Sequence, residues 1–408
     1  MRYLDFLDLN YRPRETDIIC HFHLEPGDLP LREAAGAVAA ESSIGTWTEL
    51  RTLKPYMVDL RARVYEIRGN RVSVAYPIEL FEPGNLPNLL SSVAGNIFGM
   101  SAVSKLRLLD IELPEELLRS YPGPRYGIEG VRRLLKVWGR PLLGTIIKPK
   151  LGLKTGDHAM VAYMAWRGGC DIVKDDENLA DQRFNPFEDR VVETLEMRDR
   201  AEEETGERKA YLVNITAETG EMLRRAEYVE DHGGRYVMID ILTAGFAALQ
   251  TLREAGFKLA LHGHRAGHAA FTRPERHGVS MRVIAKLARL AGIDQLHVGT
   301  AVGKMAEPKE RVLENIEALK MLMKGIKPAM PVASGGLHPA LVPELLKIFG
   351  TDAIIQAGGG VHGHPDGTEA GAKAMRQAIE AAMKGISLRE YAEEHQELAK
   401  ALERWDDG

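Results

Sequence analysis

The sequence contains very little cysteine: Cys20 and Cys170 are the two among its 408 residues. Cysteines so few and so far apart indicate neither a disulfide framework nor a zinc site, and they favour a reducing, cytoplasmic setting. Long apolar runs are also missing, and none reaches the length needed to span a bilayer. The N-terminal residues Met-Arg-Tyr-Leu-Asp-Phe-Leu-Asp are broken by acids and lack the apolar core of a signal peptide. We therefore expect a protein with no membrane segment and no secretion signal.

An excess of basic charge is absent as well. Lys and Arg total 53 against 58 Asp and Glu, which gives a net charge of −5. Without a global positive field, nucleic acids and anionic membranes are poor candidate partners, and any anion site must be local. Apolar residues make up 45% and charged residues 27% of the chain, which is typical of a soluble globular protein. The length predicts two domains, one of them large.

The first 130 residues mix strand-like and helix-like patterns. Strand patterns cover residues 17–23, 63–67, 71–76 and 106–111, and helical patterns cover residues 31–41 and 88–98. Gly69-Asn70, between two of these strands, is typical of a hairpin turn. The segment from Tyr121 to Pro124 has the composition of a linker. We therefore predict an α+β domain with an antiparallel sheet over residues 1–130, followed by a second domain over residues 131–408.

The remainder of the chain alternates short apolar runs with helical stretches. The apolar runs cover residues 142–147, 171–173, 210–214, 236–241, 259–262, 295–298, 331–333 and 353–356. Eight such β-then-α units predict a (β/α)₈ TIM barrel. A doubly wound open sheet is the alternative, although no G-x-G-x-x-G motif follows the first run. Two further helices are predicted over residues 368–383 and 388–405.

Polar and glycine residues follow most of the eight predicted strands. Their segments are Lys148-Pro-Lys150, Lys174-Asp-Asp-Glu177, Asn214-Ile-Thr216, His262-Gly-His-Arg265, His297-Val-Gly-Thr300, Ser334-Gly-Gly336 and Gly358-Gly-Gly360. The active sites of TIM barrels lie at the carboxyl ends of the strands, so these groups are expected to converge on one face.

Lys174, Asp176 and Glu177 form the most informative of these segments. Lys174 and Asp176 share one face of the chain because side chains alternate along a strand. Two neighbouring carboxylates suit Mg²⁺, whereas a lysine ammonium would repel the ion. A lysine carbamate would supply an anionic oxygen instead, and partial burial would favour the neutral amine that its formation requires. The alternative is a solvated charged loop.

The other segments suit proton transfer and phosphate binding. Lys148 and Lys150 lie two residues apart, and each makes the other easier to deprotonate, unless they form a plain basic turn. The glycines after the seventh and eighth strands can bind phosphate through backbone N–H groups, or can serve as tight turns. Arg265 and His297 could hold a second phosphate, which would imply a bisphosphate substrate.

Three histidines raise the alternative of a zinc site. His262, His264 and His268 are closely spaced, and H-x-H on a strand can bind zinc. An arginine stands beside them and no cysteine is near, so we favour catalytic or structural histidines over zinc ligands.

In combination these motifs resemble the large subunit of Rubisco. The similar segments are residues 144–152, 168–178, 262–268, 297–304, 334–336 and 358–360, with Glu41–Trp47 and Gly95–Phe98 in the N-terminal part. The resemblance covers nearly the whole chain. It is nearest to the archaeal, form III type through residues 127–130, 270–273 and 363–367.

The resemblance implies a Mg²⁺-dependent lyase that carboxylates ribulose 1,5-bisphosphate to 3-phosphoglycerate, with O₂ as a competing gas. Lys174 would carry an activating CO₂ as a carbamate, remove the C3 proton, and bind Mg²⁺ together with Asp176 and Glu177. The other implied roles are Lys148 in later proton transfer, Lys150 near the metal, His264 at the substrate hydroxyls, Ser334 at the sugar, and Lys304 on a mobile loop at the new carboxylate. Arg265 and His297 would bind one phosphate, and Gly335, Gly336, Gly358, Gly359, Thr46 and Trp47 the other.

The resemblance also implies a homodimer or an assembly of dimers, because Glu41 and Asn96 would reach the site of a partner subunit. No small subunit is expected.

The sequence departs from the family at several places, among them Ile146, which replaces the threonine of plant-type members, and the stretch Leu50–Met57. Gly267 stands where methionine is usual, and the segment after Lys304 is short and poor in glycine. Two alternatives stay open: an enolase or isomerase of the Rubisco-like type, or a non-catalytic phosphosugar-binding barrel. The sequence does not distinguish nucleotide salvage from carbon fixation.

Overall fold

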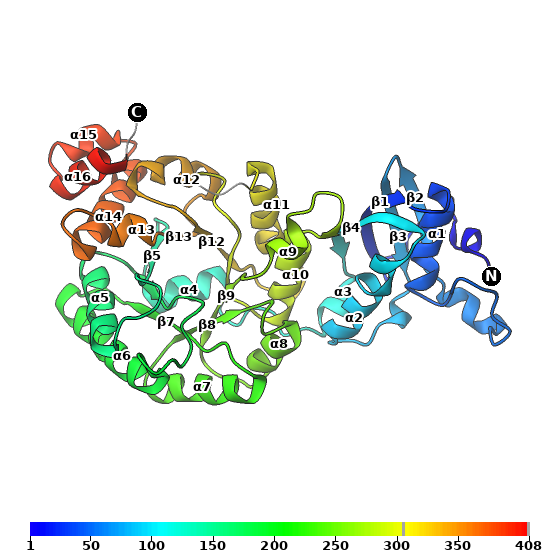
Figure 1. The fold of residues 1–408 in the computed structure, drawn as a ribbon, viewed down its shortest axis with the longest axis horizontal. Coiled ribbons are helices and arrows are strands. Elements are labelled where there is room, and N and C mark those ends of the chain that lie inside the picture. Colours follow the sequence, from blue (N-terminus) through cyan, green and yellow to red (C-terminus); the bar gives the residue numbers. More distant parts are fainter. Residues whose placement is uncertain (304–306, 406–408) are drawn as a thin grey trace. The chain divides into compact units, whose positions relative to one another are not determined.

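The computed structural model describes residues 1–303 and 307–405, which Figure 1 draws as a ribbon. The chain forms two compact units. Unit 1 comprises Met1–Pro122, Gly267–Ala291 and Leu322–Ile326, and unit 2 comprises Gly123–Ala266, Gly292–Met321 and Lys327–Gly408. Each unit is therefore built from segments distant in sequence, and the boundary near residue 130 stays a prediction. Among the described residues, no helix is both long and apolar enough to cross a membrane.

Unit 1 contains the predicted antiparallel sheet. Its strands are β1 (Ile18–Pro26), β2 (Arg63–Arg68), β3 (Arg71–Tyr76), β4 (Val103–Glu112) and β10 (Gly278–Val279), in the order β10-β4-β1-β3-β2. The β2–β3 hairpin turns at Gly69, whose φ of +56° favours glycine. β10 joins β4 in parallel and was not foreseen, because two residues carry no periodicity.

Short helices complete unit 1. They are η1 (Tyr3–Phe6), α1 (Leu31–Glu41), η2 (Pro55–Leu60), η3 (Ile78–Leu80), α2 (Leu86–Val93), η4 (Asn96–Gly99), α3 (Glu115–Leu118), α9 (Ala269–Thr272) and α10 (Met281–Ala291). The single helix predicted over residues 88–98 is wrong, since α2 ends at Val93. The chain doubles back there, and a Cβ on Gly95 would lie 2.0 Å from the carbonyl oxygen of Ser91.

Unit 2 is the predicted barrel, closed in the order β11-β12-β13-β5-β6-β7-β8-β9. All eight predicted strands are confirmed. They are β5 (Leu142–Ile146), β6 (Ile172–Lys174), β7 (Ala210–Asn214), β8 (Tyr236–Asp240), β9 (Ala260–His264), β11 (Gln295–His297), β12 (Met330–Ser334) and β13 (Ile354–Gln356). Every neighbouring pair is parallel, so all carboxyl ends meet at one face of the barrel.

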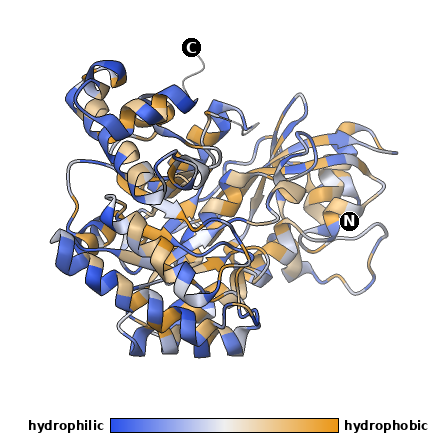
Figure 2. Cartoon of the chain, turned by 60° about the vertical axis from the view of Figure 1, so that its left-hand side comes forward, coloured by the Kyte–Doolittle hydropathy of each residue, from blue (hydrophilic) through white to orange (hydrophobic). Residues whose placement is uncertain are grey.

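Helices surround these strands, as Figure 1 shows for α5 to α8. They are α4 (Gly127–Leu135), α5 (Thr155–Arg167), α6 (Phe187–Thr205), α7 (Thr219–Asp231), α8 (Phe246–Glu254), α11 (Lys309–Lys320), η5 (Pro339–Leu341), α12 (Val342–Phe349), α13 (Gly359–His362), α14 (Thr368–Lys384), α15 (Leu388–Ala392) and α16 (Gln396–Trp405). In Figure 2 these outer helices alternate hydrophilic and hydrophobic residues, as expected when one face packs on the barrel.

The predicted helix over residues 388–405 is interrupted between α15 and α16. The ring Nδ1 of His395 hydrogen-bonds the carbonyl oxygen of Tyr391 at 2.7 Å, while the backbone N–H of His395 donates to Ala392 instead. The side chain thus takes the acceptor that a continuous helix would use.

The amino ends of the barrel strands are apolar. Val131 and Leu135 of α4 pack in one buried cluster with Leu142, Ile172, Ala210, Tyr236, Ala260, Met330 and Ile354, each the first residue of its strand. Helix α4 therefore closes this end of the barrel. Gln295, the first residue of β11, is the polar exception, and the candidate site lies at the opposite end of the strands.

Two buried aspartates, Asp171 and Asp294, each stand just before a barrel strand. Their carboxylates accept hydrogen bonds from backbone N–H groups and from arginine side chains. Asp294, just before β11, accepts hydrogen bonds from the backbone N–H groups of Tyr126, Gly127 and Leu261 at 2.7–2.9 Å, and from Arg253 at 2.6 Å. Asp171, just before β6, accepts from Arg140, from Arg376 and from the backbone N–H of Leu143. Each carboxylate satisfies donors from several segments.

We predict that Asp294→Asn lowers the stability of the protein by about 3–5 kcal/mol, because an amide cannot accept four hydrogen bonds and leaves the buried Arg253 charge without a counter-charge. Thermal unfolding followed by circular dichroism measures the change. The exposed Asp231→Asn is the matched control and should shift the midpoint little. Equal shifts for the two variants would contradict the role assigned to Asp294.

Candidate active site

A buried lysine amine lies at the polar end of β6. Lys174, the last residue of the strand, is 0% exposed, and its Nζ donates to the backbone oxygen of Asp175 at 2.7 Å. Nζ also lies 3.6 Å from Oε2 of Glu177. Burial lowers the pKa of Lys174 below its ordinary value, although the carboxylates of Glu177 and Asp176 oppose this shift. The amine is thus closer to its neutral, nucleophilic form than a surface lysine.

A second lysine reaches the same carboxylates from the neighbouring strand. Lys148 follows β5, and its Nζ lies 2.7 Å from Oδ2 of Asp176. Burial tends to raise the pKa of Asp176, but hydrogen bonds from Lys148 and Asn178 outweigh it and keep the pKa below its usual value. A Cβ on Gly358 would lie 3.3 Å from Cε of Lys148, so a side chain there would crowd this lysine. Lys150 is exposed.

Asp175 points away from this group and anchors it from behind. Its Oδ1 accepts from Tyr211 at 2.7 Å and from His158 at 3.1 Å, while Oδ2 accepts from the Asn214 backbone at 3.0 Å and from Arg190 at 3.3 Å. Burial alone would raise the pKa of Asp175, but the Arg190 charge and these hydrogen bonds lower it to about 2. Donors from α5, α6 and β7 therefore fix the backbone that presents the flanking residues Lys174 and Asp176.

A histidine–aspartate pair completes the carboxylate side of the site. His264, the last residue of β9, lies 2.6 Å through Nδ1 from Oδ1 of Asp240 and 3.6 Å through Nε2 from Oε2 of Glu177. The sequence prediction included His264 and omitted Asp240. An acid at the end of the apolar run Tyr236–Asp240 was the signal that could have revealed it.

Arg265 follows β9 and His297 ends the neighbouring strand β11, and these are the two residues that the sequence predicts for an anion site. Both are buried, and the positive charge of Arg265 helps to depress the pKa of His297, although burial is the larger cause. Nη2 of Arg265 pairs with Oε2 of Glu307 at 3.0 Å. Its Nη1 is buried and has no partner within residues 1–303 and 307–405. Glu307, which the sequence prediction missed, thus leaves one guanidinium nitrogen for a ligand.

The two glycine segments follow β12 and β13 as predicted. Gly335 and Gly336 have φ of +125° and +65°, and both follow Ser334, the last residue of β12. A Cβ on Gly360 would lie 2.2 Å from the carbonyl oxygen of Leu337, so the start of α13 packs directly on the segment after β12. Gly359 is exposed and has open space in front of it.

The remaining predicted residues belong to unit 1 or lie outside the described residues. Glu41, Thr46, Trp47 and Asn96 belong to unit 1, where Glu41 ends α1 and accepts a hydrogen bond from Tyr3. Trp47 is 80% exposed. Lys304 lies outside the described residues, so its role remains a prediction.

The three histidines considered for zinc have three different partners. His264 pairs with Asp240, Nε2 of His262 lies 2.8 Å from Nε2 of His297, and His268 bonds Thr272. Over residues 1–303 and 307–405, no three His, Cys, Asp or Glu side chains converge as metal ligands. A metal at Asp176 and Glu177 would thus need a third ligand of another kind.

Comparison with known families assigns both parts of the chain. Residues 127–405 match the model of the ribulose bisphosphate carboxylase large chain, catalytic domain, and residues 5–117 match that of its N-terminal domain. The chain belongs to the Rubisco large-chain family. The resemblance inferred from the motifs is therefore confirmed.

Archaeal Rubisco proteins are among the relatives. The ribulose bisphosphate carboxylase of Methanocaldococcus jannaschii is 54% identical, covering 98% of this chain and 100% of the relative. The octameric Rubisco of Pyrococcus horikoshii OT3, solved as a complex with sulfate ion, is 50% identical with a TM-score of 0.96, covering 99% and 97%. The dimeric archaeal Rubisco of Hyperthermus butylicus is 49% identical with a TM-score of 0.92, covering 99% of each chain.

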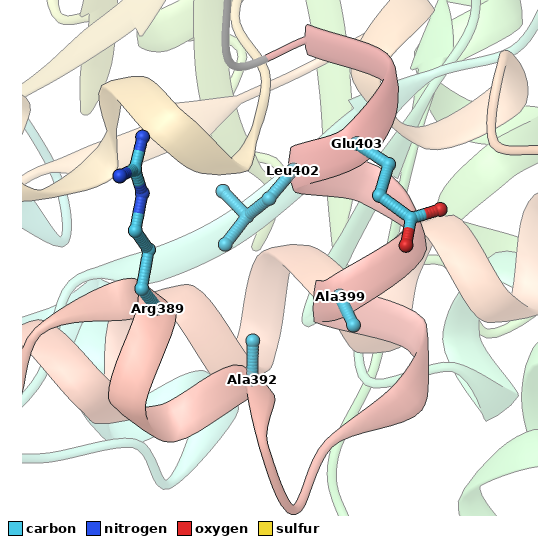
Figure 3. Close-up of a pocket in the computed structure, with 5 residues that line it drawn as sticks. All are labelled: Arg389, Ala392, Ala399, Leu402 and Glu403. Carbon is cyan, nitrogen blue, oxygen red and sulfur yellow. The ribbon is translucent and has the colours of Figure 1, made fainter. Parts of the chain in front are cut away.

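A hollow on the C-terminal helices is unrelated to this Rubisco site. It lies between α15 and α16 and is lined by Arg389, Ala392, Ala399, Leu402 and Glu403 (Figure 3). Ala392 and Leu402 point into the space between the two helices, whereas Glu403 points away from it. None of these residues follows a barrel strand, so we do not assign them to the site.

The Asp175 network predicts a specific loss of stability in acid. A carboxyl whose pKa is about 2 in the folded protein and ~3.9 when unfolded adds about 2–3 kcal/mol above pH ~4, and this contribution is lost as the pH falls towards 2. Asp175→Asn should therefore be less stable than wild type at neutral pH, with the difference shrinking by about 1 kcal/mol by pH ~3.

Unfolding midpoints between neutral pH and pH ~3 measure this difference. Asp231→Asn again serves as the control, with a constant difference from wild type across the range. A difference between Asp175→Asn and wild type that did not shrink would show that Asp175 is not held ionised by its donors.

Proposed function

We propose that this chain is a lyase that carboxylates ribulose 1,5-bisphosphate, yielding 3-phosphoglycerate. The observation that carries the proposal is the fully buried amine of Lys174, which lies 3.6 Å from the Glu177 carboxylate at the carboxyl end of a barrel strand. Full-length relatives that are named ribulose bisphosphate carboxylase support the same assignment.

Lys174 is the residue proposed to carry the activating CO₂. A neutral amine adds to the carbon of CO₂ and loses a proton, which gives an anionic carbamate. Burial favours the neutral amine, and the carbamate would add a third anionic oxygen group to those of Asp176 and Glu177. The donor set would then consist of hard oxygens, which fits Mg²⁺. When bound, Mg²⁺ stabilises negative charge on neighbouring substrate oxygens.

The other residues bind the substrate and move protons. Lys148, which pairs with Asp176, is proposed to donate a proton late in the reaction, and Asp240 is proposed to hold His264 in orientation. Arg265 and His297 are proposed for one phosphate. Backbone N–H groups of residues 335–336 and 358–359, with Thr46 and Trp47, are proposed for the other. Lys150 is proposed near the metal and Ser334 at the sugar.

The assembly is proposed from the relatives, which include dimeric and octameric archaeal enzymes. We propose a homodimer as the smallest active unit, in which Glu41 and Asn96 complete the partner's site, without a small subunit. The domain division at residue 130 and a form III, cytoplasmic enzyme belong to the same proposal. Two buried free cysteines are consistent with a reducing compartment.

Lys174→Ala should lower the rate of carboxylation by at least about 10²–10³-fold, because it removes the amine that is proposed to capture CO₂. The assay is incorporation of labelled CO₂ into 3-phosphoglycerate after incubation with bicarbonate and Mg²⁺. Lys154→Ala, at an exposed lysine, is the control and should keep activity. A Lys174→Ala variant with wild-type turnover would refute the proposal.

Lys304→Ala should impair carboxylation more than enolisation, because a lysine at the new carboxylate acts only after the C3 proton has been removed. Exchange of the C3 proton of ribulose bisphosphate with solvent reports enolisation, and labelled 3-phosphoglycerate reports the full reaction. Equal losses in both assays would show that Lys304 acts earlier than proposed.

A further inference from the structure

A row of three buried side chains runs from the barrel interior to the proposed phosphate site. Oε1 of Gln295 lies 2.9 Å from Nδ1 of His262, and Nε2 of His262 lies 2.8 Å from Nε2 of His297. Gln295 and His297 lie two residues apart on β11 and so share a face, and His262 is the β9 residue in register with Gln295. The exposures of Gln295, His262 and His297 are 0%, 0% and 5%.

The contact between the two rings has a direction. Of two facing imidazole nitrogens, one must donate a proton and the other must accept it. Burial lowers the pKa of His262 to about 3 and that of His297 well below its ordinary value, so both rings are neutral near pH 7. Each ring therefore carries one N–H, and the row has two possible proton arrangements, each the reverse of the other.

A bound phosphate would select one of these arrangements. Nδ1 of His297 has no hydrogen-bond partner within residues 1–303 and 307–405, and the ring lies near Arg265. A phosphate dianion only accepts hydrogen bonds, so Nδ1 of His297 must donate. Nε2 of His297 then accepts from His262, and Nδ1 of His262 must accept from Gln295.

Gln295 can supply the hydrogen bond that this arrangement requires. Its Nε2 is buried and has no partner in the described chain. Rotating the amide by a half-turn exchanges its oxygen and nitrogen with almost no change of shape, and directs an N–H at Nδ1 of His262. After this rotation the carbonyl oxygen of Gln295, and not its N–H group, is left without a partner. A buried oxygen without a partner costs less free energy than a buried N–H group without one.

We propose that Gln295 is a positioning residue for phosphate binding, which acts through His262 to keep the proton of His297 on Nδ1, facing the phosphate. The inference rests on the proposed function, because it takes the ligand at His297 and Arg265 to be a phosphate of the substrate. Gln295 itself touches neither the substrate nor the reacting atoms.

The first test replaces the amide by a group of similar shape without a hydrogen-bond donor. Gln295→Met should raise KM for ribulose bisphosphate about 10-fold, the equivalent of one hydrogen bond to a charged group, and change kcat less than about twofold. Gln356→Met is the matched control, because Gln356 is also buried at a strand end with its amide unpartnered. Its KM should stay within about twofold of wild type. An unchanged KM in Gln295→Met overturns the proposal.

A double-mutant cycle separates positioning from general damage to the barrel. In His297→Gln the side-chain amide can donate an N–H to the phosphate whichever nitrogen of His262 carries the proton. The effect of Gln295→Met on KM should therefore vanish in the His297→Gln background. An equal effect in both backgrounds would mean that Gln295 acts through structure alone, and would overturn the proposal.

Binding of inorganic phosphate, followed by calorimetry on the full-length protein, tests the inference without catalysis. Gln295→Met should weaken this binding, and an unchanged affinity overturns the proposal even if turnover is normal. A wild-type protein that binds phosphate but makes no 3-phosphoglycerate would instead refute the proposed function. ¹⁵N spectra of labelled histidine give the tautomers directly: a proton on Nδ1 of His297 supports the proposal, and one on Nε2 overturns it.

Discussion

The site depends on one constraint, the burial of a lysine amine among carboxylates. At the amino end of the barrel, α4 and the apolar first residues of seven strands exclude water, and the residues proposed for chemistry lie at the other end. Lys174 lies at that end and is fully buried, with its amine held by a backbone carbonyl and faced by Glu177. Burial and the acids act on its pKa in opposite directions, and burial is the larger effect.

Because side chains alternate along the strand, Asp175 supports the structure of the site, whereas Lys174 and Asp176 face the site itself. Asp175 points outward to Arg190, His158 and Tyr211, while Lys174 and Asp176 point to the site. The outward carboxylate accepts hydrogen bonds from four donors and thereby holds the backbone that presents the inward groups. Asp175 and Asp176 look equivalent in the sequence, but Asp175 holds the backbone and Asp176 faces the site.

The sequence predicted what depends on periodicity and on the ends of strands. All eight barrel strands follow from short apolar runs, and Lys148, Lys174, Asp176 and His264 converge because parallel strands end together. It did not predict Glu307 beside Arg265, because the two residues are 42 positions apart and no sequence pattern relates them. The sequence also did not reveal the two-residue strand β10 or the end of α2 at Val93. Both depend on local backbone contacts, such as the one at Gly95, that no periodic pattern indicates.

The proposed phosphate sites differ from the proposed metal site in how they respond to pH. Backbone N–H groups do not titrate, and His297 is held neutral by burial, so neither proposed phosphate site changes its protonation near pH 7. The strength of the proposed hydrogen bond from His297 to a phosphate depends instead on which ring nitrogen of His297 carries the proton. In the proposed row this is set by His262 and Gln295, which are both uncharged. The carbamate proposed on Lys174, by contrast, would form only from the neutral amine. In the proposed arrangement, activation depends on the protonation of Lys174, whereas the phosphate contact of His297 depends on the direction of a hydrogen bond.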